Sequence, residues 1–199
     1  MQQTLFRVFG YREFRPGQQE VMEALLAGRS VAAIFPTGAG KSLCYQLPAL
    51  LLPHLTLVVS PLLALMQDQL YFLRQHGVAA ASIDSTQTRE QTQVVMAQAR
   101  AGTLKILMIS VERLKNERFR HFIASVPISL LVVDEAHCIS EWGHNFRPDY
   151  LKLPHEQRQL GIPQTLLLTA TATPAVVTDM QTKFAIDNLD VVRTGFYRP

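Results

Sequence analysis

Short, uninterrupted apolar runs recur along this chain, and longer stretches with helical spacing separate them. Strands that are apolar on both faces are typical of a parallel sheet covered by helices on each side. The pattern therefore predicts a doubly wound α/β fold, in which ligands bind beyond the carboxyl ends of the strands. The predicted strands cover residues 31–35, 55–59, 79–83, 106–109, 130–133, 166–168 and 190–193.

Two predicted helices have the residue types that mark helix ends. The first covers residues 18–27, and Gly28 is expected to stop it. The second begins at Thr173 as N-cap and Pro174 as first helical residue, and runs to about residue 185. With 199 residues, 48% of them hydrophobic, the chain can form one globular domain with a substantial core.

Composition excludes several classes of protein. The longest apolar stretch, residues 47–59, is interrupted by two prolines and a histidine, so it does not predict a membrane span. No secretory signal is visible, and Cys44 and Cys138 do not form a zinc-type pair. We expect small buried cysteines, a cytoplasmic protein and no membrane partner. The net charge of +3 does not by itself indicate nucleic-acid binding.

A glycine-rich turn, Pro-Thr-Gly-Ala-Gly-Lys-Ser, follows the first predicted strand. Backbone N–H groups of such a turn, with the start of the next helix, form an anion site. Lys41 should reach the β- and γ-phosphates, and Ser42 should ligate Mg²⁺. The stricter motif has glycine where Phe35 stands, and an ordinary turn between strand and helix is the alternative. The residues predicted to bind the triphosphate are Thr37, Gly38, Ala39, Gly40, Lys41 and Ser42.

An acidic pair, Asp134 and Glu135, follows the fifth predicted strand. A carboxylate at the end of a buried strand is costly unless it serves a cation, so we assign Asp134 to Mg²⁺, through water. Glu135 should position and deprotonate the attacking water, and His137 should act as a hydrogen-bonding relay. A pair that caps the next helix is the alternative. Together with Lys41, these three residues are the predicted catalytic set for splitting a nucleoside triphosphate.

The two motifs, with Thr-Ala-Thr-Ala at 169–172, resemble the first motor domain of a superfamily 2 helicase. Segments at 9–18, 43–49 and 138–148 narrow the resemblance to the RecQ family of DNA helicases. The resemblance covers nearly the whole chain. It implies a RecA-like P-loop NTPase domain over residues 1–195, with ATP and Mg²⁺ as cofactors. Residues 196–199 resemble the start of a linker to a second motor domain.

The family resemblance also implies an activity and partners. An ATP-dependent 3′–5′ DNA helicase moves along single-stranded DNA and unwinds partly duplex DNA in repair or recombination, in a bacterial nucleoid or a nucleus. A second RecA-like domain normally completes such a site with an arginine, worth about 10³–10⁵ in rate. We therefore expect these 199 residues to bind ATP weakly, hydrolyse it slowly and unwind nothing.

Five further residues receive roles from the resemblance. Tyr11, Arg15 and Gln18 match the segment that recognises adenine, Tyr11 by stacking and Gln18 by hydrogen bonding. A hydrophobic lead-in followed by a turn is the alternative. Thr169 and Thr171 match the motif that links nucleotide state to domain movement, although a strand-end hydroxyl pair serving the Thr173 cap remains open.

Residues 140–148 match an aromatic-rich loop directly after the acidic pair. The loop holds the single tryptophan, Trp142, with His144, Phe146 and Arg147 close by. Aromatic side chains stack on bases of any sequence, at about 1–3 kcal/mol per base. We expect DNA on this loop to rearrange the catalytic carboxylate and histidine, so that hydrolysis is fast only with DNA bound. The alternative is that the two aromatic side chains pack inside.

Two weaker matches, at 60–62 and 85–88, suggest contacts with the DNA backbone, for which helix capping is an equal alternative. The chain departs from the common family form at Gln67, where lysine is usual, and at Val111, where proline is usual. Two other functions stay open on the residues alone. One is a small-molecule kinase, and the other is a non-catalytic module that binds ATP without turnover.

Overall fold

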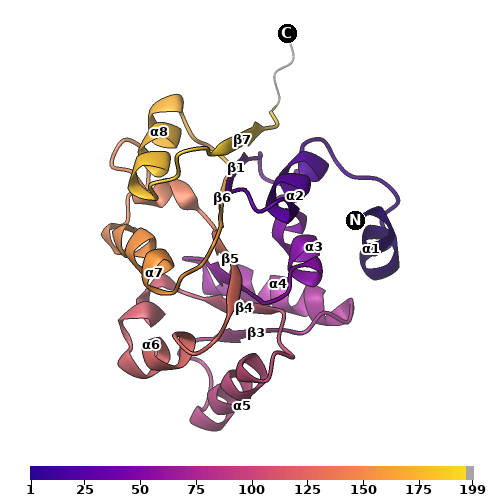
Figure 1. Cartoon of the computed structure of the whole chain (residues 1–199), viewed down its shortest axis with the longest axis vertical. Coiled ribbons are helices and arrows are strands. Elements are labelled where there is room, and N and C mark those ends of the chain that lie inside the picture. Colours follow the sequence, from indigo (N-terminus) through magenta and orange to yellow (C-terminus); the bar gives the residue numbers. More distant parts are fainter. Residues whose placement is uncertain (196–199) are drawn as a thin grey trace.

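The computed structural model describes residues 1–195, so the linker expected at 196–199 lies outside the described residues. Seven parallel strands form one sheet in the order β3-β4-β2-β5-β6-β1-β7 (Figure 1). All seven predicted strands are confirmed, with ends that shift by no more than two residues. They are β1 (Val31–Ile34), β2 (Leu55–Val59), β3 (Ala80–Ile83), β4 (Ile106–Ile109), β5 (Ile128–Val133), β6 (Thr165–Thr169) and β7 (Asp190–Arg193).

Helices cover both faces of the sheet, as the apolar strands require. One core layer lies under α2 (Gln18–Leu26), α3 (Leu43–Leu51) and α4 (Leu63–Gln75). The opposite layer lies under α5 (Arg89–Arg100), α6 (Glu117–Ile123), α7 (Leu153–Gln159) and α8 (Pro174–Lys183). Shorter elements are α1 (Gln2–Thr4), the π-helical turn Leu5–Phe9, and 3₁₀ turns at Val111–Lys115, Ala136–Ile139 and Pro148–Lys152.

The helix ends follow the predicted signals. Gly28 lies just beyond α2 with a φ of +85°, and α8 begins at Pro174 after the Thr173 cap. The Thr173 hydroxyl accepts a hydrogen bond from the Val176 N–H at 3.3 Å. Among residues 1–195, every helix is too short or too polar to span a membrane.

Both cysteines are buried, as expected. Burial raises the pKa of the Cys44 thiol to about 12 and that of the Cys138 thiol to about 11. Both thiols are therefore protonated at neutral pH, so neither is a ready nucleophile or metal ligand.

The strand order brings the motif-bearing strands together. β6 lies between β1 and β5, and Ile34 is in register with Thr169. Because all strands are parallel, the glycine-rich turn after β1, the acidic pair after β5 and Thr169 at the end of β6 lie at one edge of the sheet. This edge is where ligands bind in such folds.

Candidate active site

The glycine-rich turn has the backbone that an anion site requires. Gly38 and Gly40 have φ values of +84° and +79°, which other residues rarely adopt. A Cβ at Gly40 would lie 2.3 Å from the side-chain nitrogen of Gln18, so the turn also needs glycine for space. Within residues 1–195, the N–H groups of Gly40 and Lys41 have no acceptor, which leaves them free to bind phosphate oxygens.

Arg15 and Gln18 brace this turn from the N-terminal segment. The Arg15 guanidinium donates to the Gly38 carbonyl at 2.7 Å, and the Gln18 amide donates to the Gly40 carbonyl at 2.8 Å. The Arg15 N–H in turn donates to the Gln18 side-chain oxygen at 2.8 Å. These bonds direct both carbonyls away from the anion site, and they bury the Gln18 side chain beneath the turn.

Tyr11 lies beside the braced turn and is half exposed. Together with Arg15 and Gln18 it lines a hollow of about 360 Å³, which extends to Gln46 of α3 and Phe72 of α4. The structure thus brings together the three residues assigned to adenine, next to the glycine-rich turn.

Ser42, at the start of α3, is held by a residue that the sequence did not reveal. The Gln69 side chain on α4 donates to the Ser42 hydroxyl at 3.0 Å, and its amide oxygen accepts from the Tyr45 hydroxyl. Gln69 lies three residues after the buried Met66 and directly before the buried Leu70. A glutamine on the inner side of an amphipathic helix was the available signal.

Asp134 lies at the end of β5 with only 7% of its surface exposed. Burial raises the pKa of its carboxyl, against the charge of Lys41, which lowers it. Lys41 therefore lies close enough to Asp134 for its charge to act on the carboxyl. Asp134 accepts hydrogen bonds from the Ser60 hydroxyl at 3.4 Å and from the Glu135 N–H at 3.0 Å. The structure therefore places Ser60, which the sequence linked to DNA, beside the acidic pair.

The backbone of Glu135 has an unusual conformation, which sets the direction of its side chain. Its φ is +54°, in the left-handed region that residues with a Cβ seldom adopt, and such strain clusters at functional sites. The Glu135 carboxylate lies 3.6 Å from the His137 Nε2 atom. The Tyr150 hydroxyl fixes the same corner by donating to the Asp134 carbonyl at 2.9 Å, a role the sequence did not indicate.

His137 connects the acidic pair to β6. Its Nδ1 atom lies 2.8 Å from the Thr169 hydroxyl oxygen, and that hydroxyl donates to the Thr171 carbonyl at 2.9 Å. Because the hydroxyl proton is used there, we assign the ring proton to Nδ1, which donates to Thr169. Burial and the charges of His144 and Lys41 lower the pKa of His137. The ring is therefore neutral, and its Nε2 lone pair faces Glu135.

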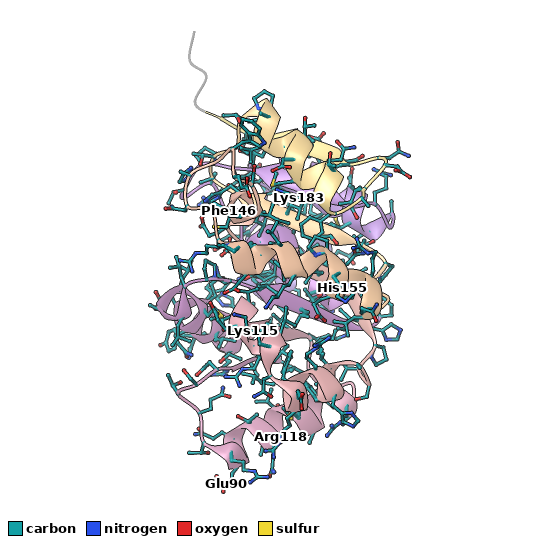
Figure 2. All side chains as sticks on the ribbon, turned by 90° about the vertical axis from the view of Figure 1, so that its left-hand side faces the viewer. Glu90, Lys115, Arg118, Phe146, His155 and Lys183 are labelled. Atoms are coloured by element: carbon teal, nitrogen blue, oxygen red, sulfur yellow. The ribbon has the colours of Figure 1, made fainter. Side chains whose placement is uncertain are left out.

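The loop after the acidic pair is exposed, as predicted. Trp142 has 77% of its surface exposed, so the alternative of a buried indole is wrong. His144 is exposed and stacks on His137, with ring centroids 4.5 Å apart and ring planes inclined by 19°. Phe146, labelled in Figure 2, is half-buried, and Arg147 is exposed. Trp142, His144 and Thr171 line a hollow of about 740 Å³ at the edge of the sheet.

In the segment at 85–88, Thr88 caps α5 in a reciprocal pair with Gln91, at 2.9 and 3.1 Å. The DNA contact suggested for this segment stays a prediction. Gln67, where lysine is usual in the family, donates to the buried Asp84 carboxylate at 3.3 Å. In this chain residue 67 therefore adds an uncharged donor to the hydrogen bonds around the Asp84 carboxylate at the end of β3.

Known proteins resemble this chain in sequence. The model of the DEAD/DEAH box helicase family matches residues 15–180. The chain is 48% identical over 181 residues to the probable ATP-dependent DNA helicase RecS of Bacillus subtilis, covering 90% of this chain and 36% of the relative. It is 43% identical over 196 residues to the ATP-dependent DNA helicase RecQ of Pasteurella multocida, covering 98% and 31%. The chain thus spans about a third of the length of these relatives.

Solved structures share the fold at low sequence identity. A hypothetical ATP-dependent RNA helicase from Sulfolobus tokodaii matches with a TM-score of 0.72 at 21% identity, covering 96% of this chain and 57% of that chain. The DUF1998 helicase MrfA bound to DNA matches with a TM-score of 0.74 at 21% identity, covering 96% and 28%. The fold is that of RecA-like helicase domains.

The family found by sequence comparison agrees with the position of the motifs in the structure. The motifs of an NTPase lie where a parallel sheet binds its ligands, and the family model covers both of them. The chain therefore belongs to the DEAD/DEAH box helicase family, and it is similar to the RecQ and RecS helicases over nearly all of its length.

Proposed function

We propose that this chain is the ATP-binding motor domain of a RecQ-like ATP-dependent DNA helicase, which couples ATP hydrolysis to movement on single-stranded DNA and to duplex unwinding. One observation carries the proposal. Lys41, Asp134 and Glu135 meet at one edge of the sheet, and His137 links them to the exposed loop of Trp142 through its stacked neighbour. The names of the RecQ and RecS relatives support DNA as the partner.

ATP would occupy the sheet edge with adenine in the hollow beside Tyr11 and its phosphates on the glycine-rich turn. The residues present suit Mg²⁺. The Ser42 hydroxyl and the Asp134 carboxylate are oxygen donors, which Mg²⁺ prefers, and the buried carboxylate has a raised pKa that a nearby cation would offset. When bound, the ion neutralises charge on the β- and γ-phosphates. Release of Ser42 from Gln69 would free its hydroxyl for this role.

Glu135 is positioned to accept a proton from the attacking water. The neutral His137 presents an acceptor to it, so the histidine does not occupy the carboxylate with a hydrogen bond. Lys41 would stabilise the charge that develops on the transferred phosphate. The products are ADP and inorganic phosphate, and the proton passes to Glu135.

DNA binding at the Trp142 loop would change the rate of ATP hydrolysis. Bases that stack on Trp142 would contribute about 1–3 kcal/mol each, without selecting a sequence. Because His144 lies against the His137 ring, a shift of the loop would move the ring and with it the neighbour of Glu135. A second RecA-like domain would supply the remaining groups, and the whole protein would work where cellular DNA lies.

Substitution of the proposed base provides the test. In the whole protein, Glu135→Gln should bind ATP but lose at least about 10²-fold in DNA-stimulated hydrolysis, since general bases contribute about 10²–10⁴-fold. Glu23→Gln removes the same charge from an exposed position on α2 and should leave the rate unchanged. Full turnover in Glu135→Gln would contradict the assignment and favour a non-catalytic module. Phosphate transfer to a small acceptor, insensitive to DNA, would favour a kinase.

A second measurement tests whether the Trp142 loop couples DNA binding to ATP hydrolysis. Trp142→Ala should lower the stimulation of ATP hydrolysis by single-stranded DNA in the whole protein and leave hydrolysis without DNA unchanged. Tyr71→Ala is a matched control, because Tyr71 is also strongly exposed but lies on α4. Undiminished stimulation of the tryptophan variant would rule out the loop as the route of coupling.

A further inference from the structure

A basic groove lies between α5 and α6, away from the residues assigned to ATP. It is a hollow of about 340 Å³, which we call the α5–α6 groove. Arg89 and Arg100 of α5 and Arg118 and His121 of α6 line it, above the apolar side chains of Met96 and Phe122. Figure 2 labels Arg118 on the side of the molecule that carries α6.

The cations of the groove are not neutralised within the domain. Among residues 1–195, Arg89, Arg100 and Arg118 form no ion pair, and no carboxylate lines the hollow. The acidic neighbours on the same helices lie outside it, and Glu117 lines a separate hollow on the far side of α6. Like charges gathered in a concave surface create a positive potential that attracts a polyanion.

One of these cations is held in place by packing instead of by a counter-charge. The Arg100 guanidinium carbon lies 5.2 Å from the centroid of the Phe122 ring. Stacking on an aromatic face orients a guanidinium and leaves its charge and its N–H donors available. An oriented arginine of this kind suits a phosphate, which it can bind with two parallel hydrogen bonds.

A second hollow lies at the carboxyl edge of the sheet, beside the start of α6. It has a volume of about 610 Å³, and its polar lining includes both cations and carboxylates: Asp84, Ser85, Glu112, Arg113, Lys115 and Asn116. Asn116 caps α6, and Arg118 of the α5–α6 groove is only two residues further along the chain. The Nε atom of Arg113 is buried and has no acceptor among the described residues. Asp84 and Glu112 offset the cations of this hollow, and Lys115 is paired with Asp149. The positive charge that lacks a counter-charge therefore lies in the α5–α6 groove.

We infer that the α5–α6 groove is an auxiliary site for the sugar-phosphate backbone of DNA. The inference rests on the proposed function, because it takes DNA as the polyanion. Arg89 and Arg100 lie at the first and last residues of α5, so the cations are spread along the whole groove. This spacing favours a nucleic-acid strand over an acidic peptide, since a strand carries regularly spaced phosphates along such a length. Arg89, Arg100 and Arg118 bind phosphates and read no bases.

The salt dependence of DNA binding tests this site. In the whole protein, the double variant Arg89→Gln and Arg118→Gln removes two exposed charges and keeps good helix formers. The slope of log affinity against log salt for a long oligodeoxythymidine should become shallower by about 1.4, since each lost phosphate contact on a single strand accounts for about 0.7. An oligodeoxythymidine too short to reach the groove should bind both forms equally. Hydrolysis of ATP without DNA should not change.

The matched control removes two exposed arginines elsewhere, Arg7 and Arg158, by the same substitutions. An unchanged slope in the groove variant, or an equal change in the control, would overturn the auxiliary site. Binding of polyglutamate that depends on Arg89 and Arg118, with DNA binding unaffected, would assign the groove to an acidic protein and also overturn it. If the unmodified protein bound no DNA and its hydrolysis did not respond to DNA, the proposed function would fail, and the groove proposal with it.

Discussion

Two buried aspartates, Asp134 and Asp84, lie at ends of strands in opposite electrostatic surroundings. Burial raises the pKa of Asp134, and Lys41 only partly offsets it. Burial also raises the pKa of Asp84, but hydrogen bonds from Thr86 and Ser82 outweigh it and the net pKa is lowered. The first carboxylate therefore costs stability when charged, and the second contributes stability. Only the first has surroundings that favour a bound cation.

The contrast predicts opposite effects on folding. At pH 7 and without nucleotide, Asp134→Asn should raise the free energy of unfolding by about 0.5–2 kcal/mol, as substitutions at strained active sites often do. Asp84→Asn should lower it by about 1.5–3 kcal/mol, which is what a hydrogen bond to a charged group contributes. Urea denaturation of both variants against the unmodified chain measures the two differences.

The pH dependence of these differences follows from linkage. The folded pKa of Asp134 lies above its unfolded value, so the cost is present above the folded pKa and disappears as pH falls below the unfolded one. The folded pKa of Asp84 lies below its unfolded value, so its contribution is present above the unfolded pKa and is lost as pH falls through the folded one. Differences that grew in acid would contradict both assignments.

The Thr169 hydroxyl is the acceptor for the buried His137 ring, so its removal should leave a buried donor without a partner. Thr169→Val should lower the free energy of unfolding by about 1–3 kcal/mol and reduce DNA-stimulated hydrolysis. Thr178→Val removes an exposed hydroxyl that bonds the Pro174 carbonyl at 3.0 Å and should cost less than about 0.5 kcal/mol. Equal losses of unfolding free energy in the two variants, measured by chemical denaturation, would show that the Thr169–His137 hydrogen bond does not stabilise the fold more than an exposed one.

At the scale of elements, strands were more predictable than the turns that shape the site. β2 and β4 consist wholly of apolar residues and threonine, and they are fully buried, so their pattern could be read directly. The left-handed backbone of Glu135 could not be predicted from the sequence, and neither could the hydrogen bond from Arg15 to the glycine-rich turn. Both depend on contacts between residues far apart in the sequence or on strain that the packed molecule imposes.

The start of α2 illustrates such a long-range constraint. Gly17 has a φ of +82°, and a Cβ there would lie 2.5 Å from the Thr194 side chain and 2.9 Å from the Phe35 ring. Gly17→Ala should therefore cost more than the roughly 1–2 kcal/mol of the left-handed backbone alone. Gly77→Ala is the control, because its φ is +74° and nothing lies within 4 Å. Equal losses of stability in thermal melts would show that the contacts at Gly17 relax freely.

For the whole molecule, the parallel sheet explains why one edge carries nearly all the chemistry. The glycine-rich turn follows β1, the acidic pair follows β5 and Thr169 ends β6. These three strands are neighbours in the sheet. The edge is open beside the hollow that contains Trp142 and Thr171. A partner domain that closed this edge would cover the proposed ATP site and exclude bulk water, leaving room for the attacking water alone.

A comparison of the 199-residue chain with the whole protein tests the need for such a partner. The chain should fold and bind ATP, but hydrolyse it about 10³–10⁵-fold more slowly, because an arginine from a second domain is worth that factor. The measurement is steady-state release of inorganic phosphate with saturating single-stranded DNA. Comparable rates for the two proteins would show that the chain carries a complete site.

The exposed position of its single tryptophan gives the 199-residue chain an optical probe of its own. An indole in water emits at long wavelength, and emission shifts to the blue or is quenched when another molecule covers it. Since every other aromatic residue emits weakly by comparison, intrinsic fluorescence should follow events at the Trp142 loop alone. Rapid-mixing experiments could therefore time the arrival of a DNA strand at this loop in the unlabelled 199-residue chain.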